Sequence, residues 1–242
     1  MLSTAIRLSV IGLLAVLVAA CGTLSGSGLP GRSPAPQKAL TGAERGTQLG
    51  ASLSSRDRQE LRVAALSALE QPNVNRRFSW SGDGASGTVK VGPAYLVTMN
   101  GDTQVKAPYN ISTDAILEPV AGDFVTQKRS NIRLGPSTDN SVLQTLDQGV
   151  RVRAIGVQKA SNWYLVARGD EALGYIFGEL IAPVPGGDLL LAGGEPGQLR
   201  VCREMTHRVQ LANGLKDAWY NGACRVGSGF WSVFGGEPVP TS

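Results

Sequence analysis

Short segments of alternating apolar and polar residues, separated by turn residues, make up most of this sequence from about residue 77 onward. The chain has 31 glycines and 13 prolines in 242 residues, and these two residue types interrupt regular structure often. Alternation over about four to eight positions is typical of strands with one buried face. The sequence therefore predicts a mostly β fold built from many short strands.

One segment has helical spacing. Between residues 54 and 70 the apolar side chains recur on one helical face, at Leu61, Ala64, Ala65, Ala68 and Leu69. Ser54 and Asp57 have the spacing of a capping box, and Pro72 is expected to end the helix. Three arginines lie mostly off the apolar face and are expected to be solvated: Arg56, Arg58 and Arg62. The predicted fold thus adds one helix, packed on an antiparallel sheet, to the β structure.

The N-terminus has the pattern of an export signal. An uncharged run from Leu8 to Ala20 is too short to span a bilayer, which takes about 20 apolar residues, but it fits a secretory leader. The run ends in Leu-Val-Ala-Ala-Cys, which resembles a lipobox, so residues 1–20 are predicted to be a lipoprotein signal peptide. The resemblance implies cleavage before Cys21 and lipidation there with diacylglycerol and a further acyl chain such as palmitate. The alternative is an ordinary cleaved leader with an unrelated cysteine.

The predicted lipid anchor sets the expected location. Residues 21–52 are rich in small and polar residues, which bury too little surface to offset chain entropy, and are predicted to be a flexible tether. Gly22 rather than Asp follows Cys21, a pattern that resembles outer-membrane sorting in enteric bacteria. The expected location is the bacterial cell envelope, with the protein lipid-anchored in the outer membrane and facing the periplasm or the surface.

Residues 122–184 have the spacing of a small β barrel. Strands separated by turn signals every 8–12 residues or so are predicted at 124–126, 131–134, 142–146, 150–155, 163–167 and 173–177. The run Ser-Asn-Ile-Arg-Leu-Gly-Pro-Ser at 130–137 resembles the first conserved patch of bacterial SH3 domains. Later patches of that family are similar to residues 149–152, 163–166 and 174–176, with Tyr175 where the family has Trp.

This resemblance implies a binding module. Bacterial SH3 domains in other proteins bind cell-wall peptide stems or act only as adaptors. The candidate ligand-binding residues are Arg133, Trp163, Tyr164 and Tyr175. Each aromatic residue has an alternative role as part of the barrel core or wall.

The pieces that flank the barrel are predicted to form one split α+β domain. Residues 53–97 and 198–236 together resemble the C-terminal region of the 17 kDa surface-antigen lipoproteins, in a helix, a Trp hairpin and a Cys-Arg-Glu to Ala-Cys-Arg segment. The glycine-zipper segment of that family is absent. Residues 98–121 are expected to be a connector, 185–197 a return linker and 237–242 a frayed tail.

Cys202 and Cys224 are predicted to form a disulfide. Export places both in an oxidising compartment. Residues 212–214, Ala-Asn-Gly, read as a three-residue hairpin loop. An unbroken register from that loop sets Cys202 opposite Cys224 in a non-hydrogen-bonded pair, where Cα atoms lie about 4.5 Å apart. A second bulge, expected near Gly222 if anywhere, would break this register.

Few residues are available for catalysis or for metal binding. The chain has one histidine, His207, and it lies in a predicted strand without a catalytic motif. His207 and the cysteines do not make a zinc-site pattern, and no phosphate loop or dinucleotide motif occurs. The net charge of +4 comes without basic–aromatic clusters, which argues against nucleic acid. We therefore expect no enzyme activity, no cofactor and no metal.

Three function classes follow. The favoured one is a non-catalytic, lipid-anchored adaptor whose SH3-like module binds cell-wall peptide or protein partners near peptidoglycan. The second is a structural envelope lipoprotein that binds no cell-wall ligand. The third is a peptidoglycan-modifying enzyme, or an accessory to one, with an unrecognised site.

Overall fold

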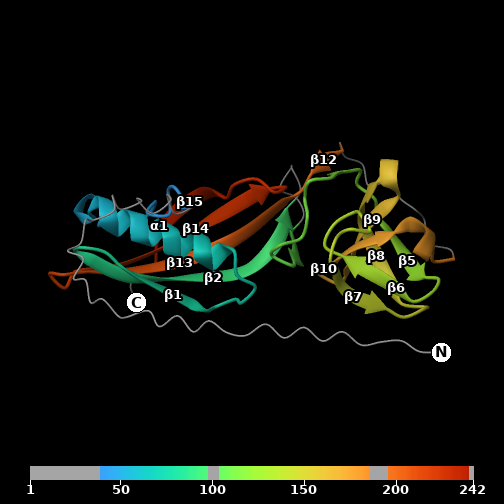
Figure 1. Cartoon of the computed structure of the whole chain (residues 1–242), viewed down its shortest axis with the longest axis horizontal. Coiled ribbons are helices and arrows are strands. Elements are labelled where there is room, and N and C mark those ends of the chain that lie inside the picture. The colour runs from blue at the N-terminus through green and yellow to red at the C-terminus, as the bar shows by residue number, and fades with distance from the viewer. Residues whose placement is uncertain (1–38, 98–103, 186–195, 240–242) are drawn as a thin grey trace, which may run out of the picture. The chain divides into compact units, whose positions relative to one another are not determined.

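The computed structural model describes residues 39–97, 104–185 and 196–239 (Figure 1). It confirms the mostly β prediction, with one α-helix among these residues. The predicted leader, Cys21 and most of the predicted tether lie outside the described residues. No helix in the described part of the chain is long and apolar enough to cross a membrane.

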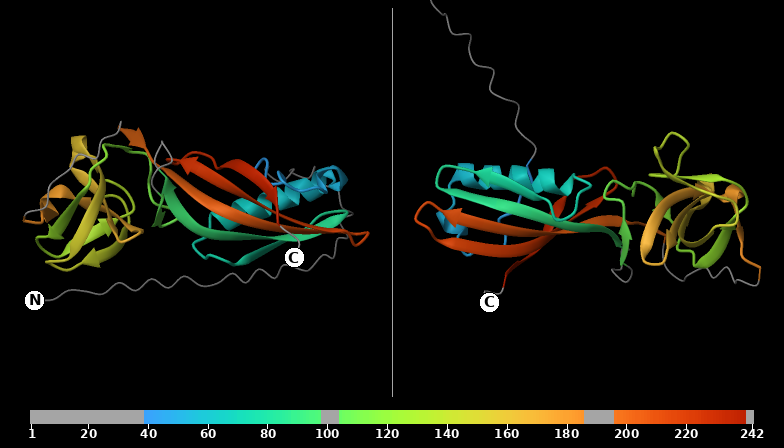
Figure 2. Two further views of the ribbon diagram at one scale, coloured as in Figure 1. Left: turned by 180° about the vertical axis from the view of Figure 1, so that it is seen from behind. Right: turned by 90° about the horizontal axis from the view of Figure 1, so that it is seen from below.

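Two distant parts of the sequence form one antiparallel sheet. Its order is β1 (Arg77–Ser81), β2 (Ala85–Val97), β13 (Arg200–Leu211), β14 (Lys216–Val226) and β15 (Ser232–Pro238). Helix α1 (Ser55–Leu69) lies along one face of this sheet and packs on β1 and β2 (Figures 1 and 2). Burial alternates along β13, where the side chains of every second residue from Val201 to Leu211, on the α1 face, are buried.

Helix α1 begins with the predicted capping box. The Ser54 Oγ accepts from the Asp57 amide at 3.0 Å, and the Asp57 carboxylate accepts from the Ser54 amide at 2.8 Å. The same carboxylate also accepts from the amides of Gly84 and Ala85, each at 3.1 Å, in the β1–β2 turn. One buried carboxylate therefore joins the start of the helix to the hairpin that the helix covers.

The three helix arginines differ in their surroundings. Arg56 is exposed as predicted. Arg58 donates to the carbonyl oxygen of Leu53 at 2.5 Å, and Arg62 forms an ion pair with Glu44. The prediction of solvation is wrong for the latter two, because residues outside the helix supply acceptors that helical spacing does not reveal.

Residues 39–52 pack against the sheet, so the prediction of a flexible tether reaching residue 52 is wrong. Leu40 and Ala43 are buried in the core between α1 and the sheet. The Ala43 carbonyl accepts from the Trp219 indole Nε1 and from the Asn221 amide, both at 3.1 Å. Composition suggests mobility here, but small residues also allow close packing of backbone against a sheet. A short 3-10 helix, Gly50–Ser52, leads from this segment toward α1.

The predicted connector, return linker and tail also contain strands. Strand β3 (Gln104–Ala107) pairs with β2, and β4 (Ile116–Leu117) pairs with β12 (Gly197–Gln198). Strand β15 continues to Pro238, so the tail predicted at 237–242 is paired in its first residues. These strands are too short, or too rich in Gly and Pro, to stand out by alternation.

The barrel consists of β5 (Gly122–Thr126), β6 (Ser130–Arg133), β7 (Val142–Leu146), β8 (Arg151–Gln158), β9 (Trp163–Arg168), β10 (Glu171–Phe177) and β11 (Ile181–Pro183). Six of the seven correspond to predicted strands, and β7 has the predicted bounds. Its core is an apolar cluster that includes Phe124, Ile132, Val152, Val166 and Ile176. A second apolar cluster is shared with flanking strands, since Trp163 and Leu165 belong with Leu96 and Val105.

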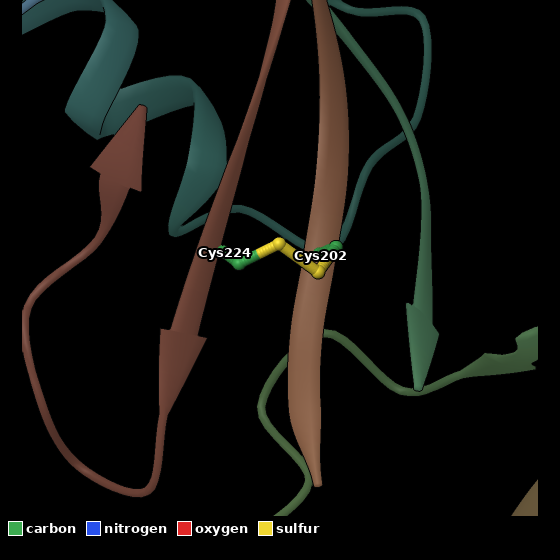
Figure 3. Close-up of a disulfide and its surroundings, with 2 residues drawn as sticks. All are labelled: Cys202 and Cys224. Atoms are coloured by element: carbon green, nitrogen blue, oxygen red, sulfur yellow. A yellow bond between two sulfur atoms is a disulfide. The ribbon is translucent and has the colours of Figure 1, made fainter. Parts of the chain in front are cut away.

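The predicted disulfide is confirmed. Cys202 and Cys224 face each other on β13 and β14 with Cα atoms 4.0 Å apart (Figure 3). The Gly214 amide donates to the Leu211 carbonyl, and Gly214 has φ +88°, as the three-residue loop requires. The bulge expected near Gly222 lies in the β14–β15 pairing and leaves the β13–β14 register unbroken.

Candidate functional site

A groove of about 820 Å³ on the barrel is the candidate binding site. Its lining comes from the loops and strand ends between β5 and β11, and consists of Arg129, Ser130, Asn131, Arg133, Pro136, Ser137, Thr138, Thr145, Ser161, Trp163, Phe177 and Leu180. Two of these are arginines and none carries a carboxylate. An anionic or carbonyl-rich ligand suits this lining, because Arg presents several N–H donors and no acceptor.

The two arginines have different surroundings. Arg129 is exposed in the turn before β6, and no hydrogen bond from its side chain is found within the described residues. Arg133 is half-buried, and its Nη1 donates to the Asn140 carbonyl at 2.7 Å. Arg133 therefore holds the loop at residues 135–140 in place, and its other N–H groups form no hydrogen bond with the described residues.

Two aromatic rings form the apolar side of the groove. The Trp163 and Phe177 rings lie 5.6 Å apart between centroids at an interplanar angle of 54°. Strands β9 and β10 position them, because Trp163 pairs directly with Phe177 in the antiparallel register. Trp163 is only 7 % exposed, so it forms part of the groove floor as well as the core.

Polar side chains complete the groove. The Thr145 hydroxyl donates to the Asn131 side-chain oxygen at 2.9 Å, which joins β6 and β7. No hydrogen bond from the Asn131 side-chain nitrogen to a described residue is found, so its two N–H groups are open to a ligand. Sequence reasoning missed Asn131 and Thr145 as site residues, although Asn131 lies in the motif that resembles bacterial SH3 domains.

The structure brings together two of the four predicted ligand-binding residues. Arg133 and Trp163 line the groove, whereas Tyr164 and Tyr175 do not. The Tyr164 ring packs on Phe124 with centroids 5.3 Å apart. Tyr175 is completely buried, and its hydroxyl donates to the Ser112 carbonyl at 2.8 Å. Burial raises the pKa of the Tyr175 phenol, so this residue stays neutral and has a structural role.

His207 lies in the α+β core. Its ring stacks on Trp219 with centroids 4.8 Å apart, and its Nε2 lies 3.0 Å from the Asn221 side-chain oxygen. Since Asn221 uses its amide nitrogen to bind Ala43, the oxygen accepts and Nε2 must carry the proton. Burial lowers the pKa of His207 to about 4, against a smaller opposing effect of the Asn221 hydrogen bond.

Asn221 and Trp219 hold the His207 ring in place, and its Nδ1 is buried with no hydrogen-bond partner among the described residues. The described residues also contain no group of three or more His, Cys, Asp or Glu side chains placed to hold a metal ion.

The geometry defines a small β barrel with an arginine-lined groove. Comparison with protein families identifies residues 128–182 as a bacterial SH3 domain, which covers the groove and most of the barrel. This comparison does not support the resemblance of the flanking residues to 17 kDa surface antigens. No curated protein and no solved structure matches the chain.

Proposed function

We propose that this protein is a non-catalytic envelope protein whose bacterial SH3 domain binds carboxylate-bearing cell-wall peptides. One observation carries the proposal: the groove combines two arginines, an aromatic wall and no acidic side chain. Cell-wall stem peptides are short, extended and rich in carboxylates, which arginine binds in a bidentate geometry. Bacterial SH3 domains are commonly involved in cell-wall binding, which supports the same class of ligand.

The proposed location is the bacterial outer membrane, where a lipid on Cys21 would anchor the protein. The Leu-Val-Ala-Ala-Cys ending of an uncharged run supports it, and Gly22 supports outer-membrane sorting. Several acyl chains on one residue give stable anchoring, at about 0.8 kcal/mol for each buried CH₂ group. An anchor of this kind would hold the groove close to the cell wall.

The lipid anchor is tested by Cys21→Ser. The variant should leave the membrane fraction and appear in the periplasm or the medium, while the unsubstituted protein stays with membranes. Cys202→Ser with Cys224→Ser serves as the control, because it removes two cysteines without touching the lipobox. A Cys21→Ser protein that stays with the membrane would refute lipid anchoring.

A binding role also fits the surroundings of the one histidine better than an enzyme does. His207 is buried and stacked on Trp219, and its pKa is about 4. A general base works best when its pKa lies near the pH of the reaction. Incubation of the purified protein with peptidoglycan should release no soluble fragments. Release that a groove variant abolishes would favour the enzyme class.

The ligand is tested by sedimentation of the protein with purified peptidoglycan. Arg129→Glu should weaken binding about tenfold or more, because it reverses a groove charge, and a charged hydrogen bond contributes roughly 1.5–3 kcal/mol. Arg129 holds no other part of the barrel, so this variant should fold normally. Arg151→Glu is the matched control, since it reverses an exposed arginine on β8 outside the groove.

Two results would contradict the proposal. Equal loss of binding in both variants would indicate attraction by net charge, without a specific site. No sedimentation of the unsubstituted protein would favour the alternative, a structural envelope protein that binds no cell-wall ligand.

A further inference from the structure

The sheet of the α+β part has one face that no described element covers. Helix α1 and residues 39–53 pack on the opposite face (Figure 1). Along β13 the side chains that point away from α1 are Arg200, Cys202, Glu204, Thr206, Arg208 and Gln210. We call the face that they share, with its neighbours on β1, β2, β14 and β15, the open face.

The open face is basic. Strand alternation and register place five basic side chains there, Arg77, Lys90, Arg200, Arg208 and Lys216, and two acidic ones, Glu204 and Glu237. None of the five forms a salt bridge with a described residue. The Arg200 Nε is also buried without a hydrogen-bond partner in the described structure. Unpaired cations on one surface favour an anionic partner.

Exposed apolar side chains lie along the β14 and β15 side of this face. Phe230 is 91 % exposed, Phe234 49 %, Tyr220 41 % and Val226 38 %. Phe230, Phe234 and Val226 line a groove of about 870 Å³ that also contains Arg200 and the disulfide. A large apolar group exposed to this degree indicates a contact surface when it is clustered with others.

The loop that carries Phe230 is anchored on both sides. The Gly227 amide donates to the Thr113 hydroxyl at 2.7 Å, and the Ser228 amide donates to the Asp114 carboxylate at 2.8 Å. On the other side, the Arg225 guanidinium lies 5.5 Å from the centre of the Trp231 ring. These contacts fix the loop, and the fixed loop holds the Phe230 side chain exposed at the surface.

We propose that the open face docks on an anionic lipid bilayer. Phe230 and its apolar neighbours would enter the interface between headgroups and acyl chains, and the basic side chains would contact lipid phosphates. Aromatic side chains beside Arg200, on a face that carries four further cations without salt bridges to described residues, match the two layers of a bilayer surface. Those layers are apolar within and negatively charged outside. The proposal concerns the α+β part alone and does not depend on what the barrel binds.

The experiment uses residues 22–242 with no lipid attached, so that anchoring cannot contribute. The protein is sedimented with vesicles of phosphatidylethanolamine and phosphatidylglycerol, and separately with vesicles of phosphatidylcholine alone. We expect binding to the first and little to the second, with binding to the first weakening as salt rises. Absence of binding to the anionic vesicles at low salt would overturn the proposal.

Two variants and two controls locate the contact. Phe230→Ser should weaken binding about tenfold, as expected when one large apolar side chain is lost from the interface. Its control is Ile116→Ser, which removes an apolar side chain that is 61 % exposed on β4. Arg208→Glu with Lys216→Glu should weaken binding by about 25-fold or more, from roughly fivefold per basic residue. Its control is Arg56→Glu with Arg151→Glu, which changes the net charge equally away from the open face.

Other partners give different results. If Phe230→Ser dissociates a dimer in sedimentation velocity and no vesicle binding occurs, the partner is a second copy of the chain and the proposal fails. If the four variants weaken vesicle binding equally, attraction is nonspecific and the open face is not the site. Because all substituted side chains are exposed, urea unfolding should confirm that each variant is folded.

Discussion

Buried polar side chains in the SH3 barrel and in the α+β sheet differ in how far along the sequence their hydrogen bonds reach. In the barrel, the buried Thr126 hydroxyl donates to the Asp147 carbonyl, 21 residues away. The buried Ser130 hydroxyl donates to the Lys128 carbonyl, two residues away. In the α+β part, the buried Arg203 donates to carbonyls of Leu69 and Gly92, 134 and 111 residues away. The barrel is continuous in sequence, whereas the sheet joins segments separated by the whole barrel.

This difference shows how a split domain is held together. Asn221 donates to the carbonyls of Ala43 and Arg45, 178 and 176 residues away, and so ties the N-terminal segment to β14. Glycines allow that segment to approach β15, since a Cβ on Gly46 would lie 2.7 Å from the Gly236 backbone. Buried polar side chains specify which distant segments meet, because an unmade buried hydrogen bond is costly. Perturbing them should therefore affect the sheet more than the barrel.

The largest effect is expected for Arg203→Leu. The Arg203 guanidinium donates four hydrogen bonds, two to Gly92 and one each to the carbonyls of Leu69 and Gln71. Its loss leaves one buried and two part-buried carbonyl acceptors unpaired and should lower the free energy of unfolding by about 4 kcal/mol. Urea unfolding measures this. Arg208→Leu, on an exposed position of the same strand, should cost less than about 0.5 kcal/mol, and equal costs would contradict the assignment.

Reduction of the disulfide should have the next largest effect. The bond joins residues 22 apart and should contribute about 3 kcal/mol in the chain-entropy model. The barrel contains no cysteine, so reduction should destabilise the sheet and leave backbone amide resonances of the barrel core unchanged. Two reactive thiols in the unreduced, urea-unfolded mature protein would show that the bond does not form.

Acidification should destabilise the sheet through His207. The pKa of His207 is about 4 in the folded protein, against about 6.5 when unfolded, so the unfolded state binds the proton more readily between these values. The stability that depends on neutral His207 is complete above pH 6.5 and falls as the pH decreases toward 4. The loss should reach about 2–3 kcal/mol at pH 4. Urea unfolding across this range measures it.

His207→Phe is the control for this pH dependence, because it keeps a ring for Trp219 and removes the titrating group. Its stability should vary much less between pH 6.5 and pH 4. Asp57 does not interfere in most of this range, since its pKa lies below the ordinary value of 3.8: burial raises it, and hydrogen bonds from Ser54, Gly84 and Ala85 outweigh that effect. An unchanged slope in the variant would assign the pH dependence to other groups.

The smallest effect is expected in the barrel, for Thr126→Val. The Thr126 hydroxyl donates to the Asp147 carbonyl at 2.6 Å and accepts from the Val150 amide at 2.9 Å. The substitution keeps the shape and removes these bonds, so it should cost roughly 1 kcal/mol. Thr145→Val, at an exposed position on β7, is the control and should cost less. A cost as large as that of Arg203→Leu would remove the contrast between the two regions.

Local signals in the sequence predict the barrel well. The strands of residues 122–184 follow from alternation and turn residues, and the motif around Arg133 lies in the segment that matches bacterial SH3 domains. The predicted ligand-binding candidates Trp163 and Arg133 line the groove. Tyr175 was also predicted as a candidate, but it is buried. Alternation indicates which side chains share a face but does not say whether that face meets solvent. Tyr175 is buried because residues before β5 pack over it, and its hydroxyl donates to the Ser112 carbonyl.

By itself the sequence determined the strands, the helix with its cap, and the Cys202–Cys224 pairing, because each depends on spacing within a short segment. Only the tertiary structure decided that residues 39–52 are packed and that Arg203 and His207 are buried. It also decided that one face of the sheet stays uncovered by described elements. These outcomes depend on contacts between segments more than 100 residues apart, and no local pattern encodes which of them will meet.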